Sequence, residues 1–240
     1  RLHSPVASHC FGFRVSAAVL IAENRPCGKE HDKNRIITIG REFGSGGREL
    51  GRRIAEKLQI AYYDREIVTE IAKRTARSDE DIRQIEDMRP RMHFPVSVGN
   101  RFYLTSEPTS EPTFYPDLSI YAKQHELLHE LSRKSDCVIV GRCADYILRE
   151  RKPVRIFAYA DMASRIRRCM ERRPEGENLT EAQMRKRIAQ IDHSRAKYYA
   201  FFSNQKWGAR ENYDLLVNTS GADLDRLASA LCGYLEALFE

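Results

Sequence analysis

The stretch Ile36–Leu50 constrains this chain more than any other. The apolar run Ile36–Ile39 leads into the glycine-dense turn Gly44–Gly47, after which apolar residues recur with the spacing of an amphipathic helix. Each glycine costs backbone entropy on folding, so three glycines among four residues exceed what a plain strand-to-helix turn needs. Converging backbone N–H groups and the positive end of a helix favour a phosphate site. A structural turn without a ligand is the alternative.

The turn departs from the usual phosphate-binding loop at the position of its cation. That loop has the pattern Gly-x-x-x-x-Gly-Lys-Ser/Thr, and here Gly47 stands at the lysine. Arg41, at the end of the apolar run, and Arg48, directly after Gly47, are the two candidates for the missing charge. The residue types alone leave both open.

Short apolar runs along the chain alternate with segments whose apolar residues have the spacing of a helix, as in a parallel α/β domain. We expect a sheet of about five strands, at Ile36–Ile39, Ala61–Tyr63, Cys137–Val140, Val154–Tyr159 and Leu215–Val217. Helices are expected at 118–135, from about Thr180 onward, and at 222–238. Ligands of such sheets bind at the carboxyl ends of the strands. Asp64, which follows the second strand, should therefore present a carboxylate to the site.

The composition indicates a folded domain and disfavours several functions. With 240 residues, 42% of them hydrophobic, the chain can bury one full core, or a core with a small appended lobe. The net charge of +6 suits phosphate-bearing partners, but 40 basic residues are interspersed with 34 acidic ones and form no run of five. Nucleic-acid binding is thus disfavoured. No apolar run approaches the length that spans a bilayer, so we expect no membrane partner.

The cysteines bear on metal binding and on location. The six cysteines form no Cys-x-x-Cys pair and have no partnering histidine at a zinc-binding spacing, so we expect no metal site among them. Cys137 and Cys232 lie in apolar patterns typical of buried, reduced thiols. This usage favours a cytoplasmic protein.

Two segments differ from the alternating pattern. Residues 1–34 contain only a short apolar patch, and we expect a poorly ordered N-terminal extension there. Residues 35–240 should form a single domain, with its core at 35–75 and 136–240. The intervening residues, about 76–135, are rich in proline and aromatic side chains and predict an insert beside the site. A surface loop without a function is the alternative.

A second basic constellation lies on the two helices after the fourth strand. The first helix carries Arg165 and Arg168, and the second carries Asp192 and Arg195. Because guanidinium groups bind phosphate oxygens bidentately, residues of about 165–197 could close over a polyphosphate. A solvated helical hairpin with balanced charges is the alternative.

The aromatic run Tyr198–Phe202 invites an interpretation as a base-stacking surface. A run of this kind within a helix usually packs against the body of its domain, so we expect packing here and likewise for Trp207. His193 has no neighbour pattern that marks a proton shuttle.

Several separated motifs occur together in a specific order. They are Ile36–Ile60 with Tyr62–Asp64, the turn Val138–Arg142, the helix Asp192-x-x-Arg195-x-x-Tyr198-Tyr199, Trp207-Gly208 and Asn212–Leu215. In this combination, which covers nearly everything after residue 35, the chain resembles the bacterial cytidylate kinase-like family. The resemblance implies a three-layer P-loop NTPase-type α/β fold with a helical acceptor-binding insert and an arginine-rich lid.

The resemblance, together with the two candidates for the missing cation, also implies a set of site residues. The donor-phosphate loop would comprise Arg41, Gly44, Ser45, Gly46, Gly47, Arg48 and Glu49. The acceptor would contact Asp64, Arg142, Asp192 and Arg195. The catalytic set would be Arg48, Arg142, Arg165, Arg168, Asp192 and Arg195, with ATP and Mg²⁺ as cofactors. Gln124 resembles a glutamine in the helix before the family's Gly-Arg turn.

Three departures from the family's pattern concern phosphate and metal. Gly47 replaces the loop lysine, and Glu49 takes the place of a hydroxyl near magnesium. Val140 and Cys143 stand where better-characterised cytidylate kinases carry acidic residues. We expect a nucleotide kinase that moves the γ-phosphoryl group of ATP onto a nucleoside monophosphate such as CMP or dCMP. A nucleotide-binding protein without transfer and a kinase for another small acceptor stay open, as does the oligomeric state.

Overall fold

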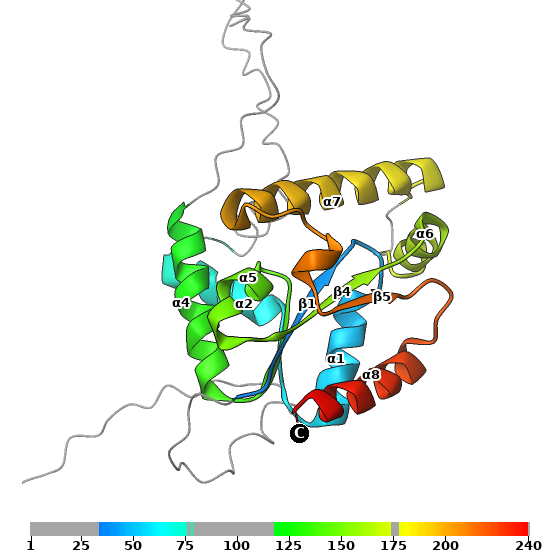
Figure 1. Ribbon diagram of the computed structural model, residues 1–240. Helices are drawn as coiled ribbons and strands as arrows, with labels where there is room; N and C mark the ends of the chain where they lie inside the picture. Colours follow the sequence, from blue (N-terminus) through cyan, green and yellow to red (C-terminus); the bar gives the residue numbers. More distant parts are fainter. Residues whose placement is uncertain (1–33, 76–77, 79–117, 174–177, 240) are drawn as a thin grey trace, which may run out of the picture.

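The computed structural model describes residues 34–75, 78, 118–173 and 178–239 (Figure 1). Its strands are β1 (Ile36–Arg41), β2 (Ala61–Tyr63), β3 (Cys137–Val140), β4 (Val154–Tyr159) and β5 (Leu215–Asn218). They form one parallel sheet in the order β2-β3-β1-β4-β5, which confirms the predicted strands. Because β1 lies between β3 and β4, the strand order reverses at β1. The loop after β1 therefore lies where ligands of such sheets bind.

The helices occupy the intervals between the strands. They are α1 (Gly47–Leu58), α2 (Arg65–Thr75), α4 (Leu118–Lys134), α5 (Ala144–Ile147), α6 (Met162–Glu171), α7 (Glu181–Ser203) and α8 (Leu224–Phe239), with the short 3₁₀ helices η2 (Arg149–Arg151) and η3 (Arg210–Asn212). The predicted helices at 118–135, from Thr180 and at 222–238 are confirmed to within two residues. None of the described helices is long and apolar enough to span a membrane.

Successive residues of the central strands pack on opposite faces of the sheet. On one face, Ile36 and Cys137 join the buried side chains of α2, α4 and α5. On the other face, Ile37 and Val138 join those of α1 and α8. Such near-continuous apolar strands are typical of a parallel sheet covered on both faces. The result is the predicted three-layer α/β arrangement (Figure 1).

The helices α6 and α7 pack on each other through a small core of their own. Ile166, Met184 and Ile188 are buried in it, and Phe43 of the loop after β1 packs against them. The loop is thus attached to the α6–α7 pair as well as to the sheet.

Two expectations about domain organisation fall largely outside the described residues. They are the extension at 1–34, apart from Asn34, and most of the insert at about 76–135. The described part of that insert, α4, packs against α2 and contributes Leu127 and Leu128 to the core.

Candidate active site

The loop between β1 and α1 is built around two glycines with left-handed backbone angles. Gly44 has a φ of 78° and Gly46 a φ of 82°. Packing also excludes a side chain at Gly44, because a Cβ atom there would lie 2.9 Å from the carbonyl oxygen of Arg165 in α6. These glycines therefore serve both the turn and the close approach of α6.

Several backbone N–H groups of this loop find no acceptor within the described part of the chain. They belong to Gly44, Gly46, Arg48 and Glu49. Arg48 and Glu49 lie in the first turn of α1, where the helix dipole adds positive potential. Donors left open at the start of a helix bind anions, so the loop fits the predicted phosphate site.

The outer side of the loop is tied to α6 and α7 by an ion-paired network. Asp192 accepts a hydrogen bond of 2.7 Å from the Phe43 N–H and pairs with Arg165. Arg165, which is buried, donates to the Phe43 carbonyl at 2.8 Å and lies 3.2 Å from the Glu42 carboxylate. Burial raises the pKa of Asp192, whereas the Phe43 N–H and Arg165 act in the opposite direction. The structure thus places Asp192 and Arg165 behind the loop, as supports for its backbone.

Arg168 of α6 and Thr219 after β5 support the next carbonyl of the loop. Arg168 donates to the Ser45 carbonyl at 3.2 Å, and the Thr219 hydroxyl donates to the same oxygen at 2.5 Å. Arg168 also donates to the Thr219 carbonyl. These contacts fix the loop from the side of its carbonyls. Sequence reasoning missed Thr219, since a threonine after a short strand carries no signal of its own.

Asp64 lies at the carboxyl end of β2, as predicted, and is 3% exposed. Its Oδ2 is 2.6 Å from Arg48 Nε, and its Oδ1 is 3.9 Å from the Arg41 guanidinium. Both candidates for the missing lysine therefore converge on one buried carboxylate.

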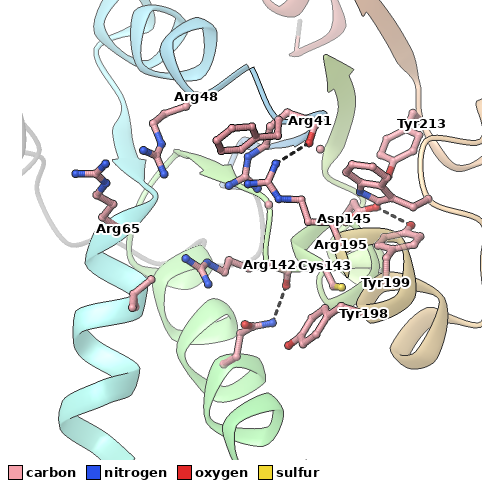
Figure 2. A pocket seen from close by; sticks show the side chains of 16 residues that line it. Arg41, Arg48, Arg65, Arg142, Cys143, Asp145, Arg195, Tyr198, Tyr199 and Tyr213 are labelled. Carbon is pink, nitrogen blue, oxygen red and sulfur yellow. Dashed lines mark hydrogen bonds between the residues drawn. The ribbon is translucent and has the colours of Figure 1, made fainter. Parts of the chain in front are cut away.

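A cavity of about 270 Å³ lies beside the loop at the carboxyl edge of the sheet (Figure 2). Five arginines line it, namely Arg41, Arg48, Arg65, Arg142 and Arg195. Its other walls include Cys143, Asp145, Tyr198, Tyr199, Trp207 and Tyr213. This excess of positive charge in a concave site favours an anionic ligand. The predicted residues Arg165, Arg168 and Asp192 do not line the cavity.

The turn after β3 brings Arg142 into the cavity through an unusual backbone. Gly141, Arg142 and Cys143 have successive φ angles of 74°, 62° and 50°, all left-handed. A residue other than glycine in this region costs about 1–3 kcal/mol and persists only where its surroundings hold it. Gln124, buried in α4, donates to the Arg142 carbonyl at 2.8 Å. The glutamine singled out in the sequence therefore supports the Gly-Arg turn.

The Arg142 guanidinium is buried beside the charge of Arg41. Burial, followed by the charge of Arg41, lowers the pKa of Arg142 to about 9, although Asp64 acts in the opposite direction. A buried cation of this kind is stabilised when an anion pairs with it. Arg142 is therefore suited to bind a phosphate or carboxylate group.

Arg195, which lies on the same helix as Asp192, also lines the cavity. Its guanidinium donates to the Arg41 carbonyl at 3.4 Å and lies 5.5 Å from the centre of the Phe43 ring. The two ends of the Asp-x-x-Arg motif thus diverge. Asp192 contacts the loop backbone, and Arg195 lines the cavity.

Comparisons with known proteins agree with this arrangement. The model of the cytidylate kinase-like family matches residues 36–221. The chain belongs to this family. A solved structure of an uncharacterized protein from Eubacterium ventriosum ATCC 27560 is similar at 26% identity and a TM-score of 0.60, over 85% of this chain and 99% of its own. A shikimate kinase from Bacteroides thetaiotaomicron is similar at 17% identity and a TM-score of 0.51, over 84% of this chain and 98% of its own.

The likeness to the shikimate kinase shows the fold, which is that of P-loop kinases. No curated protein sequence matches the chain.

Asp145 is the acidic residue among the described residues that line the cavity. Val140 is buried in the core, and Cys143 lines the cavity. Asp145, on the first turn of α5, also lines it and accepts a hydrogen bond of 2.7 Å from the Tyr199 hydroxyl. Burial raises the pKa of Asp145, while the bond from Tyr199 acts in the opposite direction. The sequence analysis did not single out Asp145, although it follows Arg142 by three residues.

Sequence reasoning also missed the aromatic wall of the site. Tyr198 and Tyr199 pack as expected, at 8% and 4% exposure, but they line the cavity as well. Trp207 and Tyr213 join them. Tyr198 and Tyr199 follow Arg195 by three and four residues, which places all three on one face of a helix. That spacing from a predicted site residue is the signal that could have found them.

Two carboxylates near the loop bear on a magnesium ion. Glu49 pairs with Arg53 and Arg172, whose hydrogen bonds outweigh the effect of burial and lower its pKa. Asp64 Oδ1, in contrast, is buried and accepts no hydrogen bond from the described residues. Magnesium in phosphate sites is bound by one or two carboxylates besides the phosphates. Asp64 therefore fits a magnesium ligand better than Glu49 does.

Proposed function

We propose that the protein transfers the γ-phosphoryl group of ATP to a nucleoside monophosphate, with CMP and dCMP as the first candidates. The observation that carries this proposal is the adjacency of two anion sites. Open N–H groups of the loop mark one site and arginines line the other, and Arg48 belongs to both. Phosphoryl transfer needs little else than two phosphates held in contact and charge to stabilise their oxygens.

The donor triphosphate would bind to the loop. The N–H groups of Gly44, Gly46, Arg48 and Glu49 would contact its β- and γ-phosphates. Asp64 would hold magnesium, which neutralises charge on the phosphate oxygens when it is bound. The supports behind the loop, from Arg165, Arg168 and Asp192, keep these donors in place.

The acceptor would lie along the cavity with its anionic group among the arginines. Figure 2 shows Arg48 and Arg65 on one side of the cavity and Tyr199 and Tyr213 on the other, with Arg142 and Arg195 between them. The acceptor phosphate would pair with Arg142, since an anion there compensates a buried charge. The base would then lie toward Asp145, whose carboxylate can accept a hydrogen bond from the amine of cytosine.

A second class of acceptor is favoured by the charge of the cavity. Against five arginines, Asp145 is the acidic residue among the described residues that line it. This excess suits a small acceptor with more than one anionic group, and the volume of about 270 Å³ is close to the lower end of ligand pockets, about 300–1,000 Å³. A kinase for another small phosphorylated or carboxylated acceptor is therefore the second candidate.

The test is a phosphotransfer screen with ATP and magnesium. Its panel holds the common ribo- and deoxyribonucleoside monophosphates, small phosphorylated acids and shikimate, with ADP release and product mass as readouts. We expect a cytidine monophosphate to be phosphorylated fastest, by about tenfold or more, as hydrogen-bond recognition of a base allows. Phosphorylation of a small acid alone would establish the second candidate. Calorimetric binding of ATP without ADP release on any acceptor would contradict both.

A further inference from the structure

The loop differs from the general pattern at two positions that are exchanged with one another. In Gly-x-x-x-x-Gly-Lys, counting back from Gly46 places the first glycine at residue 41 and the lysine at residue 47. This chain has Arg41 at the position of the glycine and Gly47 at the position of the lysine. The cation and the glycine have therefore traded places.

These two positions face each other in the structure. A Cβ atom at Gly47 would lie 2.6 Å from Arg41 Cβ, 3.3 Å from Arg41 Cγ and 3.0 Å from Ala158 Cβ. The Cβ atom of Arg41 is fixed by the backbone, so it cannot move aside as the end of a flexible side chain would. A side chain at residue 47 and the side chain of Arg41 therefore exclude each other. Arg41 begins in the space where a loop lysine would begin.

The far end of Arg41 passes a second glycine. A Cβ atom at Gly141 would lie 1.6 Å from Arg41 Nη1, so the guanidinium lies directly against the turn after β3. From there it lines the cavity (Figure 2). The guanidinium is also 3.9 Å from the Asp64 carboxylate. The side chain thus runs from the loop to the Gly-Arg turn, across the junction of the two anion sites.

Arg48 differs from Arg41 in its exposure and in its contact with Asp64. Its side chain is 49% exposed, against 15% for Arg41, and its Nε donates to Asp64 at 2.6 Å. Arg48 therefore fits a role in holding the Asp64 carboxylate.

We propose that Arg41 performs the role of the missing loop lysine and binds the β- and γ-phosphate oxygens of the donor from the opposite wall of the loop. The glycine at residue 47 leaves room for the start of the Arg41 side chain, and the guanidinium at its far end lies against Gly141. A guanidinium can contact two phosphate oxygens at once and stays charged throughout turnover. The transfer step of this inference rests on the proposed function, but the binding step requires only that a nucleoside triphosphate occupies the loop.

The test is a cycle of Arg41→Gly, Gly47→Lys and the double variant, which restores the general pattern. Calorimetry with magnesium gives the affinity for ATP, and ADP release gives transfer. Arg41→Gly should weaken ATP binding by about tenfold or more, the value of a charged hydrogen bond. Its transfer rate should fall by about 100- to 1,000-fold, as for other lost oxyanion donors. The double variant should regain about tenfold in ATP affinity over Arg41→Gly, because the lysine replaces the lost charged contact.

Two further variants keep the result interpretable. Arg41→Lys preserves a cation at the same position and should retain ATP binding within about tenfold. This variant tests the inference independently of Gly47→Lys, in which the new side chain collides with Arg41 and can disturb folding. Arg74→Ala removes an arginine of α2 that pairs with Glu70 and Glu130, outside both sites, and should leave ATP affinity unchanged. Thermal unfolding of each variant shows whether a loss of ATP affinity comes from misfolding.

The outcomes separate this inference from the proposed function. Wild-type affinity for ATP in folded Arg41→Gly would overturn the inference. A folded double variant that binds ATP no more tightly than Arg41→Gly would also overturn it. A wild-type protein that binds ATP through Arg41 but phosphorylates no acceptor would leave the inference standing and refute the proposed function.

Discussion

The arginines on the two sides of the loop differ in what their charges meet. On the side of α6, Arg165 is buried against Asp192 and Glu42, and it donates a hydrogen bond to the Phe43 carbonyl of the loop. On the side of the cavity, the pKa of Arg142 is lowered by burial and by the neighbouring charge of Arg41. The first group has its counter-charges within the protein and shapes the loop. For Arg142, on the second side, we propose that a bound anion supplies the counter-charge, so the same residue type would serve structure on one side and ligand binding on the other.

The largest expected effect is a loss of stability when the ion pair between Asp192 and Arg165 is removed. Asp192→Ala leaves Arg165 buried without its main partner and should lower the free energy of unfolding by about 3–5 kcal/mol. Urea unfolding followed by the fluorescence of Trp207 measures this loss. Glu126→Ala, which removes an exposed pair with Lys123 on α4, should cost less than about 1 kcal/mol and is the control. Unchanged stability in Asp192→Ala, with transfer lost, would instead place Asp192 on the reactants.

The matching test on the ligand side replaces Arg142. Arg142→Met should reduce phosphoryl transfer by about 100- to 1,000-fold. Its free energy of unfolding should be unchanged or higher, because a buried cation beside another cation is replaced by an apolar chain of similar length. Steady-state kinetics and urea unfolding of one preparation measure both. Transfer at the wild-type rate, or a large loss of stability, would assign Arg142 to the structural group.

Substitution of Arg195 should also reduce transfer without reducing stability, but by a smaller factor than substitution of Arg142. Arg195→Ala should cost about 1.5–3 kcal/mol of transition-state binding, or roughly 10- to 150-fold in turnover, the value of a hydrogen bond to a charged group. Stability should change little, since its contacts are a long bond to the Arg41 carbonyl and the ring of Phe43. Turnover with the best acceptor is the measurement. Unchanged turnover would remove Arg195 from the ligand group.

The smallest expected effect is a change in how stability depends on pH. Because burial raises the pKa of Asp145, the folded protein binds this proton more tightly than the unfolded chain. The protonated Asp145 carboxyl therefore adds to the free energy of unfolding at low pH, and this contribution is lost as the pH rises from about 4 through the folded pKa. In Asp145→Asn this loss disappears, so the stability of the variant relative to wild type should rise over that range. A relative stability that is constant with pH would contradict a raised pKa.

The sequence predicted the sheet and the loop because both depend on local residue type. Apolar runs such as Cys137–Val140 define buried strands, and the glycines around Ser45 define the turn. The division among the arginines was not predictable in this way. Asp192 and Arg195 belong to one motif three residues apart, yet one contacts the loop backbone and the other lines the cavity. A motif specifies residue types, whereas the direction of a side chain depends on how helices pack.

The facing positions of Arg41 and Gly47 illustrate the same limit. They are six positions apart in the chain, and only the turn brings a Cβ atom at residue 47 within 2.6 Å of Arg41 Cβ. The sequence alone left Arg41 and Arg48 as equal candidates for the missing cation. Asp145 and Thr219 entered the site for a similar reason, because strand ends far apart in the chain meet at one edge of the sheet.

A crystal structure with a non-hydrolysable ATP analogue and CMP tests the central claim most directly. We expect the β- and γ-phosphates within hydrogen-bonding distance of the N–H groups of Gly44, Gly46, Arg48 and Glu49, with the Arg41 guanidinium on the same oxygens. The CMP phosphate should contact Arg142. A triphosphate bound elsewhere, with these N–H groups facing solvent, would contradict the account.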